Sequence, residues 1–190
     1  MGTFQPSSRL CTNAPTPILL NVGFEDAMDE TAEDSRPAQI EWSVVKFGDM
    51  SPKDLYELLA LRTAVFVVEQ HCPYQECDGL DYEAIHIIGR CIAENPRIVA
   101  YMRCLAPGVV FPEAAFGRVI VAKEMRGGQL GKELVGRGLA IRSTWPGKGL
   151  KINAQVGLVR YYRHFGFEPV GEPYDEDGIE HIAMALKEVS

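Results

Sequence analysis

Hydrophobic residues recur along this chain with two different spacings, which predict a mixture of helices and strands. From Ser51 to Phe66 they stand three or four positions apart, as on the buried face of an α-helix. Ser51 can cap the first turn of this helix, and Pro52 fits the first helical position because it has no N–H to bond. Runs rich in Val, Ile, Tyr and Phe predict strands instead. These lie at 42–47, 84–90, 97–105, 116–121, 150–155, 167–169 and 181–186.

Two more helices are predicted, at 128–142 and 157–165. The chain therefore runs strand, long helix, three strands, helix, strand, helix, two strands. Three successive strands favour an antiparallel meander, whereas the strand–helix–strand unit that follows favours a parallel pair. We expect an α/β domain at residues 40–190, built on a mixed, mostly antiparallel central sheet with helices on both faces.

Residues 1–39 have a different pattern. Four prolines, several Ser and Thr and an acidic stretch at 25–34 stand there with only a short apolar run at 18–24. Such a segment buries too little apolar surface to offset the entropy lost on ordering. We therefore expect a disordered or loosely packed N-terminal tail.

Composition narrows the class of protein. The 190 residues are 46% hydrophobic and 24% charged, which suffices for a packed core. The net charge of −7 argues against nucleic-acid binding, which needs a basic face. The sequence has no run of about 18 apolar residues, so no membrane-spanning helix is predicted. The apolar patch that follows Arg9 is too short for a signal peptide. A cytoplasmic protein without nucleic-acid or membrane partners is expected.

The cysteines predict reduced thiols and no metal site. There are five, an odd number, in a chain that lacks a secretory signal. Cys72 and Cys77 have no second pair at the spacing that zinc sites use. Neither a disulfide framework nor a metal is expected.

The most informative segment is 119–134, where a β-branched strand runs into a helix through Arg126, three glycines and Lys132. A helix start carries unpaired backbone N–H groups and the positive end of the helix dipole, which together bind phosphate. Glycines allow a phosphate to approach the backbone closely. The spacing differs from G-x-x-x-x-G-K-[ST] and from G-x-G-x-x-G. Taken alone, the segment is either a phosphate site or a flexible turn.

This segment resembles the R-x-x-G-x-G/A motif of the GNAT family of N-acetyltransferases, with Gln129 where that family usually has glycine. A second hallmark, a tyrosine four residues before a Gly-Phe pair, is matched by Tyr162 with Gly166 and Phe167. Three further stretches resemble the ElaA-like subgroup of the family: 61–70, 78–81 with His86, and 174–181. The resemblance covers residues 42–186.

The resemblance implies the GNAT fold, in which the parallel pair of strands splays apart, and acetyl-CoA as the donor. The pantetheine arm would pair with the backbone of Val119 and Val121 like an extra strand, and an N–H of that strand can stabilise the reaction oxyanion. Two residues depart from the family pattern. Gln129 stands where the family usually has glycine, and Gly157 stands where a histidine is expected in the subgroup. Gln129 obliges the phosphate loop to shift or weakens donor binding. The donor-binding residues implied are Val119, Val121, Arg126, Gly127, Gly128, Gln129, Gly131, Lys132 and Gln155.

Transfer of an acetyl group to an amine requires a base for the ammonium proton and an acid for the leaving thiolate. Tyr162 matches the family's acid, and its alternative role is to pack or to hydrogen-bond the cofactor sulfur. Glu69 and His181 are the candidate bases, the second because an imidazole titrates near neutrality. Each has a structural alternative: Glu69 as a solvated or N–H-capping carboxylate, and His181 as a hydrogen-bonded histidine.

Other polar residues are expected to be structural. We assign Tyr161 to the core and His86 to a hydrogen-bonded position within it. Arg103 and Arg118 lie within strands among apolar neighbours, where a charge needs a partner. Either could bind an acidic group of the substrate, and an ion pair within the protein is the expectation for both. Asp78 and Asp81 could hold the cation of the acceptor. Alternatively, Asp78 and Gly79 simply form a turn.

We therefore expect an acetyl-CoA-dependent N-acetyltransferase that acts on a primary amine of a small molecule or on an exposed amino group. Attack would be direct, in a ternary complex. The alternative is a non-catalytic acyl-CoA-binding or sensing module, which would keep the phosphate loop without needing a base. The acceptor, the acyl chain length and the oligomeric state stay open, with a homodimer as one option.

Overall fold

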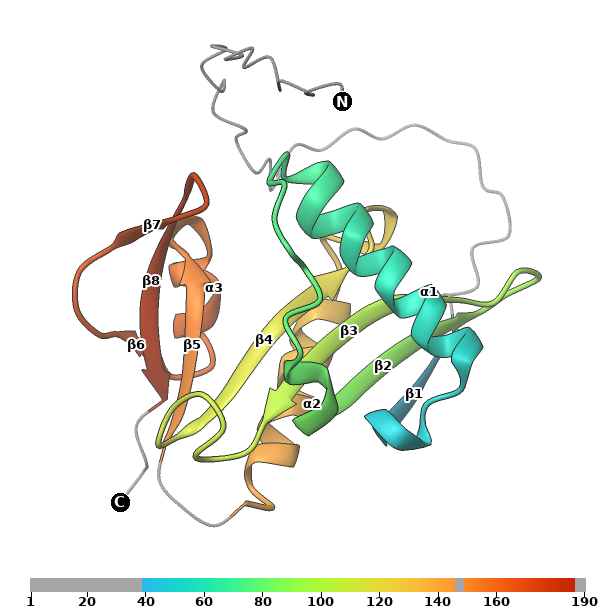
Figure 1. The fold of residues 1–190 in the computed structure, drawn as a ribbon, viewed down its shortest axis with the longest axis horizontal. Helices are drawn as coiled ribbons and strands as arrows, with labels where there is room; N and C mark the ends of the chain where they lie inside the picture. The colour runs from blue at the N-terminus through green and yellow to red at the C-terminus, as the bar shows by residue number, and fades with distance from the viewer. Residues whose placement is uncertain (1–38, 146–148, 187–190) are drawn as a thin grey trace, which may run out of the picture.

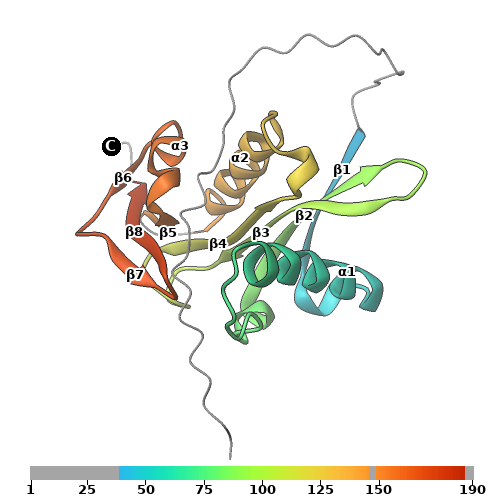
Figure 2. The same ribbon diagram turned by 90° about the horizontal axis from the view of Figure 1, so that it is seen from above.

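The computed structural model describes residues 39–145 and 149–186, which form a twisted sheet with helices on both faces (Figures 1 and 2). The elements are β1 (Gln39–Lys46), α1 (Pro52–Arg62) with a π-helical extension (Thr63–Glu69), β2 (Ala84–Ile92), β3 (Arg97–Leu105), β4 (Ala114–Val121), α2 (Leu130–Arg142), β5 (Leu150–Gln155), α3 (Val159–Arg163), β6 (Phe167–Pro169), β7 (Tyr174–Glu176) and β8 (Ile179–Leu186). Short 3₁₀ turns occupy Phe47–Asp49, Leu80–Glu83, Lys123–Met125 and Val156–Leu158. The expected tail lies outside the described residues except for Gln39, which begins β1.

The strand order in the described sheet is β1-β2-β3-β4-β5-β8-β6, with β7 paired to β8. Neighbouring strands are antiparallel except β4 and β5. This parallel pair is in register only at Ala114 with Leu150 and at Ala115 with Lys151. Beyond those residues the two strands diverge, which Figure 1 shows as an opening between yellow β4 and orange β5. The expected mixed sheet with a splayed parallel pair is thus confirmed.

The two faces of the sheet are covered by different helices. In Figure 2, α2 and α3 lie on one side of the sheet and α1 on the other. Because side chains alternate along a strand, β3 contributes residues to the apolar cluster on each face of the sheet. Met102 packs with Phe116 and Leu134 on the α2 side, whereas Tyr101 packs with Leu58 on the α1 side. Each face therefore has its own apolar core.

Helix α2 lies unusually close to the sheet at Gly138. A Cβ at this position would stand 2.5 Å from Met102 Sδ and 2.9 Å from Phe116 Cε2. At Gly136, two residues earlier in the same helix, nothing lies within 4 Å of an added Cβ. The absence of a side chain at Gly138 therefore sets how near α2 approaches β3 and β4.

The predicted elements are present, with shifted ends. β1 starts three residues earlier than expected, α2 starts at Leu130 rather than at 128, and α3 is confined to Val159–Arg163. β7 was not predicted, because its Tyr-Asp-Glu sequence has no apolar alternation. It forms because Asp177 and Gly178 turn the chain back onto β8 with φ of 54° and 84°, the conformation that Asp-Gly favours in tight hairpins.

Within residues 39–145 and 149–186, no helix is long and apolar enough to cross a membrane.

Candidate functional site

The opening between β4 and β5 leaves two strand edges facing each other, and we call this region the fork. Its β4 side is Phe116–Val121 and its β5 side is Ile152–Gln155. Val119 and Val121 are half-buried on β4, as is Gln155 at the end of β5. In the described sheet β4 and β5 do not pair with each other beyond Ala115 and Lys151, so an extended ligand could add to either edge.

A β-bulge interrupts β4 within the fork. Arg103 pairs with Gly117, but Tyr101 pairs with Ile120, so β4 has one more residue than β3 in this interval. Arg118 occupies the bulge with φ of 53°. Phe116 before the bulge packs on the α2 side and Ile120 after it on the α1 side. In a regular strand these two residues would share a face, so the bulge exchanges the faces of β4.

The glycine-rich loop connects β4 to the start of α2, as predicted. Gly127 has φ of 84°, and Gly127, Gly128 and Gln129 are all exposed. The first helical bond of α2 runs from Glu133 N–H to the Gln129 carbonyl at 3.0 Å. The N–H groups that precede it in α2 therefore have no acceptor one helical turn back. Such groups at a helix start are suited to an anion.

Gly131 in this first turn faces Tyr161. A Cβ on Gly131 would stand 3.0 Å from the Tyr161 hydroxyl and 3.8 Å from Val121. The Tyr161 ring contacts Tyr162 and Phe165, which confirms its predicted place against the core. The sequence did not indicate that the Tyr161 hydroxyl reaches the N-terminus of α2.

Arg126 and Glu69, which the sequence gave separate roles, are paired with each other. The guanidinium donates from Nη1 to Glu69 Oε1 at 2.5 Å and from Nη2 to Oε2 at 3.1 Å, and Nε donates to the Val121 carbonyl at 2.9 Å. The hydrogen bonds from Arg126 lower the pKa of Glu69. Glu69 is thus a poorer base here than an ordinary carboxylate, and Arg126 ties the helical extension to the glycine-rich loop.

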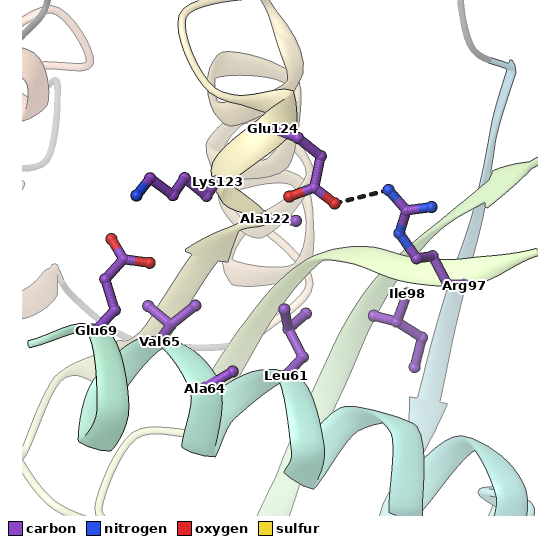
Figure 3. Close-up of a pocket in the computed structure, with 9 residues that line it drawn as sticks. All are labelled: Leu61, Ala64, Val65, Glu69, Arg97, Ile98, Ala122, Lys123 and Glu124. Atoms are coloured by element: carbon purple, nitrogen blue, oxygen red, sulfur yellow. Dashed lines mark hydrogen bonds and ion pairs between the residues drawn. The ribbon is translucent and has the colours of Figure 1, made fainter.

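A hollow of about 200 Å³ lies between this extension and the 3₁₀ turn Lys123–Met125 that precedes the glycine-rich loop (Figure 3). Leu61, Ala64, Val65, Ile98 and Ala122 give it an apolar lining. Its rim is charged, with Glu69 directed toward Lys123 and with Glu124 bonded to Arg97 at 2.6 Å.

Tyr162, the predicted acid, lies on α3 and is 7% exposed. Its ring packs edge-on against Tyr161 and Phe167. Burial raises the pKa of the Tyr162 hydroxyl, so it stays protonated at neutral pH. This is the protonation state that a proton donor needs.

His181, the second candidate base, pairs in register with Gln155 at the open end of the fork. Its Nδ1 lies 2.8 Å from the Ile179 carbonyl and its ring stacks on Tyr174. Because a carbonyl can only accept, Nδ1 carries the proton in the neutral ring and Nε2 keeps a lone pair. Ile182 and Met184, its neighbours in β8, belong to the core on the α2 side. Alternation therefore directs His181 toward the α1 side.

Behind the bulge, arginines and carboxylates interlock on the α1 side of the sheet. Arg62 bonds Glu76 and Asp81, and Arg103 bonds Asp78 and Asp81. This confirms the expected ion pairing of Arg103. Arg118 completes the set through Glu76 and Asp78. We call these residues the charge cluster: Arg62, Glu76, Asp78, Asp81, Arg103 and Arg118.

The charge cluster gives its carboxylates a structural role. Burial opposes ionisation of Asp78, but bonds from Arg103 and from the Leu80 N–H outweigh it and lower its pKa to about 2. His86 is fully buried, with Nδ1 accepting from the Tyr101 hydroxyl at 2.8 Å and Nε2 donating to the Asp81 carbonyl at 3.0 Å. This confirms His86 as a hydrogen-bonded core residue. Burial lowers its pKa.

Arg62 and Glu76 are members of the cluster that the sequence did not single out. Arg62 stands where the helical pattern expects a residue of the buried stripe, and it is 1% exposed. An arginine within such a stripe is itself a signal, because a buried guanidinium requires acidic partners. Its partner Glu76 lies 14 positions away in a loop, which no local pattern could have identified.

Comparison with known proteins gives a consistent result. The model of a family described as an acetyltransferase (GNAT) domain matches residues 91–188. Protein ElaA of Escherichia coli strain K12 is 44% identical over 149 residues, which cover 77% of this chain and 95% of ElaA. The crystal structure of Escherichia coli ElaA superposes with a TM-score of 0.71 at 42% identity, over 78% of this chain and all of that one. An acyl-CoA N-acyltransferase from Pseudomonas aeruginosa gives 0.71 at 39% identity, over 77% and 99% of the two chains.

Proposed function

Because this chain belongs to the GNAT acetyltransferase family and is ElaA-like, we propose that it transfers an acetyl group from acetyl-CoA to a primary amine. The acceptor is a small molecule or an exposed amino group, and attack is direct within a ternary complex. One observation carries the proposal: the fork between β4 and β5 opens beside the glycine-rich head of α2, so a phosphate site and a strand-pairing site adjoin.

The donor occupies both sites at once. Its pyrophosphate lies on the N–H groups of the loop from Arg126 to Gly131, with Lys132 exposed alongside, and its pantetheine arm pairs with Val119 and Val121. The exposure of Gln129 supports this placement, because its side chain has solvent to move into. A pyrophosphate can also compete with Glu69 for the Arg126 guanidinium, since phosphate is a good bidentate partner of arginine.

The proposed chemistry uses a backbone N–H of β4, His181 of β8 and Tyr162 of α3. The amine nitrogen attacks the thioester carbon, and the oxyanion that forms is stabilised by an N–H of the Val119 strand. His181 Nε2 accepts the ammonium proton, and Tyr162 donates its proton to the departing thiolate of CoA. His181 is preferred to Glu69 as the base because its Nε2 lone pair is free of the Nδ1 hydrogen bond, whereas both Glu69 oxygens accept from Arg126.

The first experiment is thermal unfolding with and without CoA and acetyl-CoA. A ligand that binds only the folded state stabilises it by about 2.7 kcal/mol at a concentration 100 times its Kd. For a domain of this size that corresponds to a rise in Tm of roughly 5–10 °C. No shift at millimolar ligand would refute donor binding. If Tm rises, a screen of amines for release of free thiol separates an enzyme from a module that only binds acyl-CoA.

A further inference from the structure

Arg118 has an unusual backbone for a residue inside a strand. Its φ of 53° lies in the left-handed region, which favours glycine and, to a lesser degree, Asn and Asp. An arginine persists there only when its surroundings hold it in place. The question is therefore which contacts hold Arg118, and what their effect on β4 is.

The guanidinium of Arg118 is held on several sides. Its Nε donates to Glu76 Oε1 at 2.9 Å, and Nη2 lies 3.3 Å from Asp78 Oδ2 and 3.4 Å from the Glu76 carbonyl. The rings of Phe66 and Tyr74 stand 5.6 and 5.7 Å from its central carbon, within cation–π distance. The side chain is thus confined by two carboxylates and two aromatic rings.

The carboxylates that hold Arg118 are themselves immobilised. Glu76 is bound by Arg62 of α1, and Asp78 accepts two bonds of 2.7 Å from Arg103 of β3. The side chains of Arg62 and Arg103 are 1% and 4% exposed. The loop that bears Glu76 and Asp78 is thereby anchored to both a helix and a strand. It provides a fixed support to which Arg118 is attached.

The charge cluster also balances internally, with three arginines facing three carboxylates. The Arg118 guanidinium is therefore committed to neighbours within the protein. Its effect falls on the backbone of β4, where the bulge turns Ile120 toward α1 and leaves Val119 and Val121 packed toward the α2 core. A strand without the bulge would reverse these directions.

We propose that Arg118 is a positioning residue: its ion pairs with Glu76 and Asp78 fix the bulge in β4 and so aim the backbone N–H of Val119 into the fork. This inference rests on the proposed function. It assigns a part in that function to Arg118, a residue that touches neither donor nor acceptor. Arg118 acts through the strand it deforms.

Two substitutions at this position separate backbone positioning from direct contact. Arg118→Ala removes the guanidinium and leaves a residue that disfavours positive φ by about 1–2 kcal/mol, a 5- to 30-fold shift in population. Arg118→Gly removes the same guanidinium but keeps the left-handed conformation accessible. We expect kcat to fall about 5- to 30-fold in Arg118→Ala with little change in KM for acetyl-CoA, and most of that loss to be recovered in Arg118→Gly. Arg137→Ala, which removes a half-exposed arginine of α2 that bonds Glu133 and lies over Trp42, should keep the wild-type kcat.

Three results with these variants would overturn the inference. Equal losses of kcat in the Ala and Gly variants would mean that the guanidinium contacts the substrates, and wild-type kcat in both would mean that it serves stability alone. If Arg118→Ala does not fold, Arg118→Lys replaces it, because a lysine keeps the charge but lacks the planar donor fork by which Nε and Nη2 of Arg118 bond Glu76 and Asp78. An unchanged kcat in that variant would likewise contradict the proposal.

A structural readout keeps this inference separate from the proposed function. Cross-strand NMR contacts between β3 and β4 report the register directly, without any substrate. We expect Arg118→Gly to keep the pairing of Tyr101 with Ile120 and Arg118→Ala to shift it. If the wild-type protein failed to bind CoA, the proposed function would be lost, whereas the register comparison would still decide whether Arg118 fixes the bulge.

Discussion

Replacement of Gly138 by alanine tests how closely α2 must approach the sheet. The glycine-rich loop leads into α2, so the distance of this helix from β3 and β4 determines where the loop lies. Gly136→Ala is the matched control, because it makes the same chemical change in the same helix where no atom lies within 4 Å. We expect opposite effects on stability from these two substitutions.

The magnitudes follow from the contacts. Alanine is favoured over glycine in a helix by about 1 kcal/mol, and both variants gain this amount. At Gly138 the new Cβ would lie 2.5 Å from Met102 Sδ, roughly 1 Å closer than a comfortable contact. Met102 is 0% exposed and Phe116 only 6%, so neither has free space. Overpacking of this kind costs about 1–3 kcal/mol.

Urea unfolding and thermal unfolding of the two variants measure the difference. We expect Gly136→Ala to be about 1 kcal/mol more stable than wild type and Gly138→Ala to be about 0–2 kcal/mol less stable. The difference in the free energy of unfolding between the two variants isolates the cost of overpacking at Gly138. It corresponds to a difference of roughly 2–12 °C in Tm. Equal stability of the two variants, or a more stable Gly138→Ala, would refute the reasoning.

Four further outcomes are expected. Tyr162→Phe should lower kcat by about 100-fold or more while donor affinity changes little, and unchanged turnover across the pH range would remove Tyr162 from the mechanism. Gly131→Leu should weaken CoA binding in calorimetry, because its side chain meets the Tyr161 hydroxyl; unaltered affinity would mean that the phosphate loop is misplaced. Stability in urea should fall as the pH drops below about 6.5, because burial lowers the pKa of His86 and the unfolded chain takes up that proton first. It should fall again below about 4, because the folded pKa of Asp78, about 2, lies under its ordinary value and the stabilisation is lost as the pH approaches it. A urea midpoint that is constant from about pH 8 to pH 3 would contradict both assignments.

Much of the fold could be predicted because it depends on local patterns. The helical spacing after Ser51 and the capped start at Pro52 are properties of a few neighbouring residues, and the structure confirms the cap with a 3.0 Å bond from the Asp54 N–H to the Ser51 hydroxyl. The parallel pair followed from the strand–helix–strand order. β7 was missed because a three-residue strand is held by its partner and its turn rather than by its own composition.

The candidate site was predictable only where one segment contains it. The loop from Arg126 to Gly131 is such a segment, and it lies where the sequence placed it. The pairing of Arg126 with Glu69 joins residues 57 positions apart, and the bonding of Arg118 to Glu76 joins residues 42 apart. Contacts of this kind depend on how α1 and its loop cross the sheet. Charge and spacing along the chain do not determine them.

The fork also bears on how this protein behaves in storage and purification. Unpaired strand edges are templates on which other copies of a chain can add, and proteins usually protect them with charges or prolines. Among the described residues the edge from Phe116 to Val121 has a single charged side chain, Arg118, and that charge is already engaged by Glu76 and Asp78. We therefore expect the ligand-free fork to be the place in the described sheet where aggregation begins. With CoA bound as proposed, the same edges are capped, so light scattering on heating should begin later than the rise in Tm alone would account for.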